Sequence, residues 1–196
     1  MRALIATTVF TVISLSSAAA QWHVGLELAT VEFRGATRDS SATPGATLRP
    51  DHATMLGIRL GRAFGSFSAA LRASMGTPGV AGVAPKVTFT DRTTGRLIEI
   101  VPLLGVRAAA LGPEGAVRVE AGPAVDLWDI DGDVRSRLAG LVAIAYEWHV
   151  AGRVTGAARI ESTLGSSIFD PADLPSQLER RPTWRYGMSL GLRYRL

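Results

Sequence analysis

The chain has 196 residues, no cysteine, and a formal net charge of +4 from 21 basic and 17 acidic side chains. The lack of cysteine excludes a disulfide framework and thiol chemistry. The arginines stand singly among acidic residues instead of in blocks, so the basic balance does not indicate nucleic-acid binding.

The start of the chain has the pattern of a secretory signal peptide. A positive charge at Arg2 precedes an apolar stretch over residues 3–15, and three alanines follow at 18–20. The apolar stretch is interrupted by hydroxyl residues and falls short of the roughly 20 residues that a membrane-spanning helix needs. We therefore expect residues 1–20 to be removed on export, which leaves one domain, residues 21–196.

Alternation of apolar with polar or small residues predicts eight strands and no helix. In the last strand, WRYGMSLGLRYRL, the large apolar side chains lie on one face and the arginines on the other. The stretches EIVPLLGV and GLVAIAY are apolar on both faces, and a change of phase near Ala29 and Thr30 predicts a bulge in the first strand. The predicted strands cover residues 22–34, 54–64, 66–76, 97–111, 115–128, 137–149, 151–164 and 183–196.

The connections alternate strictly between short and long, so the short turns meet at one end and the long loops at the other. The long loops are residues 35–53, 77–96, 129–136 and 165–182. This layout predicts an all-β fold, an eight-stranded antiparallel up-and-down transmembrane β-barrel with short periplasmic turns and long extracellular loops. Only a closed sheet leaves no unpaired backbone in lipid. The apolar faces then contact outer-membrane lipid.

Aromatic side chains gather near both ends of the predicted strands, as they do at the two interfaces of a bilayer. An alternative is that these rings form the core of a soluble barrel. The predicted interface residues are Trp22, Phe64, Phe67, Tyr146, Trp148 and Tyr194 near the short turns, and Phe33, Trp128, Trp184 and Tyr186 near the long loops.

An eight-stranded barrel is just wide enough for its own side chains to fill. The inward residues carry both signs of charge, which predicts a plug of charge-assisted hydrogen bonds rich in arginine. Small inward residues such as Gly57 and Gly187 leave a narrow water-lined or ligand-holding path as an alternative. The predicted interior charge network comprises Glu27, Arg59, Arg72, Arg107, Arg118, Glu120, Asp126, Glu147, Arg153, Arg159, Glu161 and Arg193.

A Pro-Leu-Leu strand at 102–104, a short turn and an Ala-Gly-Pro strand at 121–123 give one stretch a familiar pattern. It resembles the small outer-membrane β-barrel domain family of Gram-negative bacteria, the PorT-like and OmpW-like group. The terminal LGLRYRL is similar to the closing strand that the barrel-assembly machinery recognises. The resemblance implies a barrel and transfers no catalytic residue. Val101 departs from the pattern as an extra residue, and Leu196 replaces a final aromatic residue.

The sequence predicts no cofactor, no metal and no catalytic site. The stretch DIDGD places Asp129, Asp131 and Asp133 close together but lacks the downstream glutamate of a calcium loop, so we interpret it as an acidic turn. Binding of a cation there stays open. Asp51 beside His52 leaves a hydrolase site as an alternative, with no partnered nucleophile in the sequence.

We therefore expect a non-enzymatic, monomeric protein of the cell outer membrane. It would serve envelope structure or surface interaction by binding an unidentified extracellular ligand through its loops, with no role for nucleic acid. One alternative is a minor channel or carrier for small hydrophobic solutes. Another is a soluble barrel of the lipocalin kind, in which the apolar faces would line the cavity.

Overall fold

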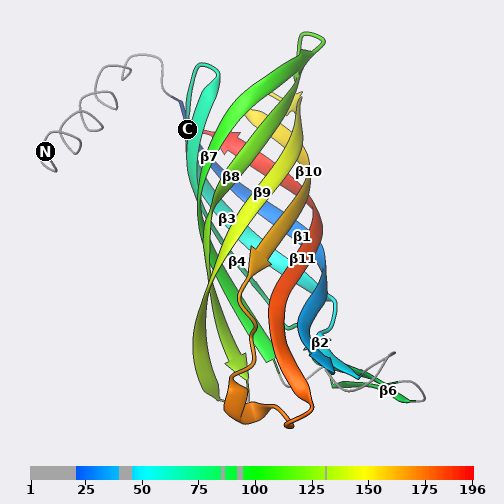
Figure 1. Ribbon diagram of the computed structural model, residues 1–196. Coiled ribbons are helices and arrows are strands. Elements are labelled where there is room, and N and C mark those ends of the chain that lie inside the picture. Colours follow the sequence, from blue (N-terminus) through cyan, green and yellow to red (C-terminus); the bar gives the residue numbers. More distant parts are fainter. Residues whose placement is uncertain (1–20, 40–45, 85–86, 92–94, 131) are drawn as a thin grey trace, which may run out of the picture.

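The computed structural model describes residues 21–39, 46–84, 87–91, 95–130 and 132–196, and the predicted signal peptide lies outside them. Eight antiparallel strands are hydrogen-bonded in a ring (Figure 1), in the order β1, β11, β10, β9, β8, β7, β4, β3 and back to β1. The predicted all-β barrel is therefore confirmed. The barrel strands are β1 (Gln21–Asp39), β3 (Ala53–Phe64), β4 (Phe67–Gly76), β7 (Gly95–Leu111), β8 (Gly115–Ile130), β9 (Asp133–Ala151), β10 (Val154–Gly165) and β11 (Leu178–Arg195).

The last strand closes the ring against the first. β11 pairs with β1 from His23↔Arg195 to Asp39↔Leu178. The tight turns after β3, β7 and β9 lie at one end of the barrel, here called the short-turn end, together with the C-terminus (Figure 1). The connections after β1, β4, β8 and β10 lie at the opposite, long-loop end.

The regions expected to be long loops contain much regular structure. Three further strands, β2 (Thr47–Pro50), β5 (Val80–Ala84) and β6 (Val87–Asp91), form a small sheet in the order β2, β5, β6 that projects sideways from the long-loop end (Figure 1). A single-turn 3-10 helix, η1 (Pro171–Asp173), precedes β11. This structure arises because backbone pairing continues beyond the point where the apolar alternation stops. No helix among the described residues is long and apolar enough to cross a membrane.

Side chains alternate between an apolar outer face and a mostly polar or small-residue lumen. On β3, the side chain of Ile58 is 59% exposed on the outer face, whereas Arg59 is only 2% exposed. On β11, Leu190 is 66% exposed and Arg193 6%. Most of the large apolar side chains in the middle of the barrel therefore lie outside, and the arginines there lie inside, which is the reverse of a soluble barrel.

The register of β7 is regular where an extra residue was expected. Its ladder with β8 runs in one register from Ile100↔Val125 to Leu104↔Ala121. The proline between these pairs has no amide hydrogen, so it interrupts the hydrogen bonds without shifting the strand. Val101 therefore lies in a regular ladder, and the expected disturbance of the register at this residue is absent.

The bulge of β1 also lies elsewhere than expected. The alternation continues unbroken through Ala29 and Thr30, and the register shift lies between Gly35 and Thr37. Gly35 and Ala36 both have positive φ, 80° and 73°. Since two consecutive left-handed residues turn the strand locally, β1 changes direction at this point, near the long-loop end.

Gly122 allows β7 and β8 to approach closely. A Cβ at this position would overlap the carbonyl oxygen of Pro102, whereas a Cβ at Gly140 on the neighbouring β9 would meet nothing within 4 Å. We expect Gly122→Ala to lower the free energy of unfolding by about 1–3 kcal/mol. The matched Gly140→Ala should change it by less than about 0.5 kcal/mol. Urea unfolding in detergent micelles, followed by tryptophan fluorescence, measures both; equal losses would contradict the close approach.

Candidate functional site

A chain of buried ion pairs fills the middle of the lumen. Arg59 donates from both terminal nitrogens to the two oxygens of Glu120, at 3.0 and 2.5 Å. Arg159 binds Glu27 in the same forked way, at 3.2 and 3.1 Å, and reaches Glu120 at 3.0 Å. Two guanidinium groups therefore share two carboxylates between four different strands.

Arg72 joins this group to carboxylates nearer the long-loop end. Its terminal nitrogens lie 2.5 Å from Glu161 and 2.6 Å from Glu99, and 3.8 Å from Glu27. Three carboxylates thus converge on one guanidinium that is 3% exposed. Arg72 is the centre of the ion-pair chain.

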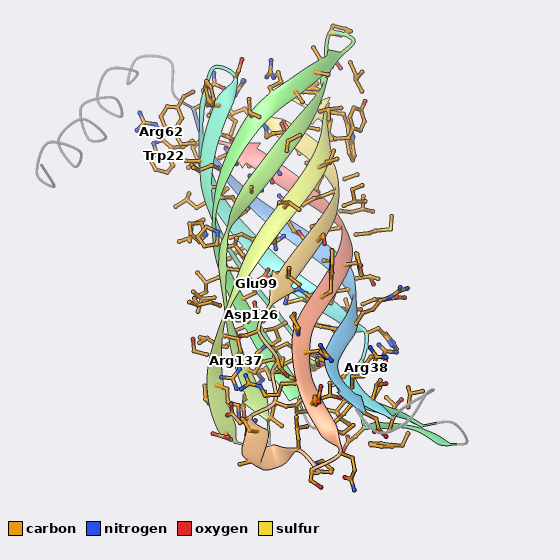
Figure 2. All side chains as sticks on the ribbon, viewed as in Figure 1. Trp22, Arg38, Arg62, Glu99, Asp126 and Arg137 are labelled. Carbon is orange, nitrogen blue, oxygen red and sulfur yellow. The ribbon has the colours of Figure 1, made fainter. Side chains whose placement is uncertain are left out.

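The ion-pair chain continues toward the long-loop end through Arg185. This guanidinium contacts Glu99 and lies 3.4 Å from Asp126. Figure 2 labels both carboxylates, about midway along the barrel. The Arg185 guanidinium also lies over the ring of Phe33, 5.8 Å from its centroid. Arg185 therefore connects the charged part of the lumen to an apolar one.

Toward the short-turn end, two arginines share one carboxylate. Arg193 and Arg118 both bind Glu147, the second at 3.2 Å, and Arg118 donates to Ser68 at 3.2 Å. Among the described residues, the complete ion-pair chain therefore contains equal numbers of arginines and carboxylates. Its six arginines are Arg59, Arg72, Arg118, Arg159, Arg185 and Arg193, and its six carboxylates are Glu27, Glu99, Glu120, Asp126, Glu147 and Glu161.

Such an arrangement holds the lumen in one conformation. Burying a charge is costly unless it is paired and hydrogen-bonded. Here each carboxylate has a guanidinium within ion-pair distance, and the forked geometry specifies direction as well as charge. The chemistry suited to this site is therefore structural filling of the barrel, and no group in it is arranged as a nucleophile with a base.

The structure brings ten of the twelve predicted interior residues into the ion-pair chain. The other two lie outside it. Arg107 is exposed at the short-turn end, immediately before a register shift in β7, and Arg153 is exposed in the tight turn after β9. Glu99 and Arg185 were not named in the predicted network, although the last strand's arginines had been placed on its inward face. Both lie on the inward face of their strands, so their alternation with neighbouring outward residues was the signal that identifies them.

Apolar side chains close the lumen at the long-loop end. Phe33 and Trp128 pack edge to face, with ring centroids 5.6 Å apart. Ile168 and Phe169, from the connection after β10, insert beside them. This segment is held by Ser167, whose hydroxyl donates to the carbonyl of Ala36 at 2.8 Å. We call this cluster the long-loop core; its buried members are Val31, Phe33, Ala36, Ala53, Met55, Leu97, Trp128, Ile168 and Phe169.

The long-loop core corrects part of the predicted aromatic interface. Trp128 and Phe33 are 2% and 1% exposed and point into the lumen. Alternate residues of a strand share a face, so Trp128 follows Asp126 inward. A second inward apolar cluster explains the stretches that were apolar on both faces, and it consists of Val101, Leu103, Ala124, Leu141 and Ala143.

The remaining aromatic residues lie on the outer face near the two ends. At the short-turn end, the Arg62 guanidinium lies between the rings of Trp22 and Phe64, 5.4 and 5.1 Å from their centroids, and Figure 2 labels Arg62 beside Trp22. Trp184 and Tyr186 stack at 5.6 Å toward the other end. The predicted residues placed on the outer face are Trp22, Phe64, Phe67, Tyr146, Trp148, Trp184, Tyr186 and Tyr194.

The two loop motifs singled out in the sequence form no assembled site. Asp129 accepts a hydrogen bond from the Gly132 amide, and Asp133 pairs with Arg135 at 2.6 Å. Asp131 lies outside the described residues. No group of three or more potential metal ligands occurs in the described part of the chain.

The second motif is a pair between Asp51 and His52. The His52 Nδ1 atom lies 3.2 Å from Asp51 Oδ1, and the imidazole is exposed. Partial burial raises the pKa of Asp51, but hydrogen bonds from the backbone and side chain of His52 lower it more, so this pKa lies below its usual value. A hydrolase site would also need a nucleophile such as a serine of the long loops. Of these, Ser40 and Ser41 lie outside the described residues, and the Ser167 hydroxyl is buried and donates to the carbonyl of Ala36.

A chamber of about 200 Å³ lies at the short-turn end of the lumen and is called the short-turn chamber. Its inner wall includes Arg59, Arg118, Glu147 and Arg193 from the end of the ion-pair chain. Exposed residues such as Arg107 form its rim. The interior is therefore closed at one end by the long-loop core and hollowed at the other.

Comparison with known proteins identifies the fold but no sequence family. No protein-family model and no curated protein matches the chain. Among solved structures, the chain is similar to neisserial surface protein A (NspA), with a TM-score of 0.59 and 13% identity over 90% of this chain and 98% of that one. It also matches Ail, the attachment invasion locus protein of Yersinia pestis, with a TM-score of 0.45 and 11% identity over 90% and 97% of the two chains.

The likeness to NspA shows a shared fold, the small eight-stranded β-barrel. At 13% identity it carries no functional residue to this chain. Membership of the PorT-like and OmpW-like group stays a prediction, because the sequence itself matches no family model.

Proposed function

We propose that this protein is an integral outer-membrane barrel whose lumen is plugged and which acts at the cell surface through its long-loop end. The observation that carries the proposal is the inverted polarity of the barrel. Soluble monomers rarely expose apolar patches larger than a few hundred Å². Here large apolar side chains cover the outer face, with Leu26, Ile58, Leu104, Met188 and Leu190 each more than half exposed.

A lipid bilayer would surround these exposed apolar side chains with hydrocarbon instead of water. Strands of this length cross a hydrocarbon layer, and the closed ring leaves no backbone edge in lipid. The outer aromatic side chains near the two ends then lie at the two interfaces, where ring and polar tip are both accommodated. The Arg62 guanidinium, held between two rings, would reach the headgroups on the short-turn side.

The long-loop end is the part best suited to contact other molecules. The sheet of β2, β5 and β6 projects beyond the barrel, and its residue Phe89 is 55% exposed. The connection after β10 is anchored by Arg137, which binds Asp170 at 2.8 Å and the Ser167 carbonyl at 2.8 Å. Because the barrel holds these elements above the membrane, their placement supports a role in binding an extracellular ligand, whose identity is unknown.

The filled lumen argues against the alternative of a channel for hydrophobic solutes. A solute crossing along the axis would have to displace both the ion-pair chain and the long-loop core. The protein is accordingly proposed to be non-enzymatic and monomeric, and to be exported by the signal peptide 1–20 and inserted by the barrel-assembly machinery.

Cysteine labelling tests which end faces the outside, since the natural chain has no cysteine. We expect Thr90→Cys in β6 to react with a membrane-impermeant maleimide on intact cells. The matched variant Glu114→Cys, in the exposed turn after β7, should react only after the outer membrane is permeabilised. Labelling of Glu114→Cys on intact cells, or labelling of both variants in a soluble periplasmic extract, would contradict the proposed function.

A further inference from the structure

Positive charge exceeds negative charge in the short-turn chamber. Five arginines line it, and Glu147 is the one acidic residue of its described lining. Glu147 is already shared by two of these arginines. Arg107 and Arg195 at the rim have no carboxylate within 4.0 Å among the described residues. Arg59, Arg118 and Arg193 belong to the balanced ion-pair chain, so the excess positive charge of the chamber is carried by Arg107 and Arg195.

Two of the buried guanidiniums that line the chamber keep unsatisfied donors. Arg193 is 6% exposed, yet its Nε and Nη2 atoms have no hydrogen-bond acceptor in the described structure. The carboxylate oxygen of Glu27 is 3.9 Å from Nη2, which is beyond hydrogen-bond length. The Nε atom of Arg59, a side chain 2% exposed, is unsatisfied as well, as are the Nε atoms of Arg72 and Arg159 deeper in the lumen. Arg193, with its two free donors, therefore marks the chamber most clearly. A buried donor without an acceptor is costly, so these atoms favour an acceptor supplied from outside the chain.

We propose that the short-turn chamber binds a small water-soluble oxyanion, with phosphate or a phosphate monoester as its class. Guanidinium forks bind such oxygens in pairs. The volume of about 200 Å³ is below the roughly 300–1,000 Å³ of pockets for drug-sized ligands, so it suits a single small group. The hydrogen-bonded wall is closed on all sides, so the anion enters along the barrel axis. The anion site itself does not depend on the proposed function; only the statement that its entrance opens to the periplasm does.

Calorimetric titration with inorganic phosphate tests the proposal on the purified chain in nonionic detergent and phosphate-free buffer. We expect saturable binding that sulfate competes for and that chloride at equal ionic strength does not abolish. The double variant Arg107→Gln/Arg195→Gln should bind about tenfold more weakly or worse, because each lost charged hydrogen bond contributes strongly to affinity. The double variant Arg96→Gln/Arg180→Gln, which loses the same charge at the exposed long-loop end, should bind as the natural chain does.

Both pairs of arginines are exposed, so the variants are expected to fold, and heat-dependent migration on a detergent gel checks this. Absence of saturable binding to the natural chain, or equal affinity of the two double variants, would overturn the site. If phosphatidic acid in the micelles competes as well as free phosphate, the group binds at the outer rim and the assignment to the chamber fails. None of these outcomes depends on which end of the barrel faces outward, which the cysteine labelling decides separately.

Discussion

Arg72→Met is expected to lower the free energy of unfolding by about 3–5 kcal/mol, the cost of leaving buried charges uncompensated. Arg72 holds Glu161 at 2.5 Å and Glu99 at 2.6 Å, and Glu27 lies at 3.8 Å. Methionine keeps most of the side-chain volume but removes the charge on which these three carboxylates converge. Urea unfolding of the refolded chain in detergent micelles, followed by tryptophan fluorescence, measures the loss.

Two further variants separate the lost ion pairs from a general effect of losing a charge. Arg180→Met removes an exposed guanidinium from β11 and should change the free energy of unfolding by less than about 0.5 kcal/mol. Adding Glu161→Gln to Arg72→Met removes one stranded carboxylate and should recover about 0.5–3 kcal/mol. A loss below about 1 kcal/mol for Arg72→Met would show that the ion-pair chain does not stabilise the barrel.

Leu190→Arg should lower the free energy of unfolding in phospholipid vesicles by about 2–4 kcal/mol, the cost of an arginine on the lipid face near the bilayer midplane. Leu190 lies on the outer face of β11, opposite Leu28 on β1 and Ala158 on β10, and is 66% exposed. Exposure of this degree in water would make the same substitution nearly neutral. The size of the loss therefore reports whether lipid surrounds the barrel.

The matched control is Leu196→Arg, which changes the same residue type at nearly the same exposure, 65%. Leu196 is the last residue, at the short-turn end, where the cost falls to about 0–1 kcal/mol. Equal effects at the two positions, together with a chain that stays dissolved and monomeric without detergent, would rule out the membrane assignment. The proposed surface role would then lose its support.

The predicted strand positions and faces followed from alternation, because successive side chains of a strand point to opposite sides whatever the neighbours are. Where the pattern was weak, prediction was weak as well. β7 and β9 are apolar on their outer faces and also carry inward apolar residues such as Leu103 and Leu141. The alternation is therefore weak in these strands, and the inward position of Glu99 was not recognised. Trp128 was assigned to the interface by its distance from the turn, although its parity with Asp126 already placed it inside.

The long-loop end was the least predictable region. Backbone pairing extends β1 to Asp39 and begins β11 at Leu178, beyond the apolar alternation that marks the strands. Ile168 and Phe169 pack with Ala36, which lies in the bulge of β1 and accepts the hydrogen bond of Ser167. No local pattern in the connection after β10 indicates this contact with β1. In the sequence, Ile168 and Phe169 are two apolar residues of a loop. Only the folded structure shows that they complete the long-loop core.

The sequence by itself determined that this chain forms a closed sheet with apolar side chains outside and arginines inside, because alternation and turn spacing are local properties. Only the tertiary structure decided which charges meet. Arg59 and Glu120 are 61 residues apart, and Arg159 and Glu27 are 132 apart. These partners face each other across the lumen, so their pairing depends on the order and stagger of the strands around the closed ring, which no stretch of sequence specifies alone.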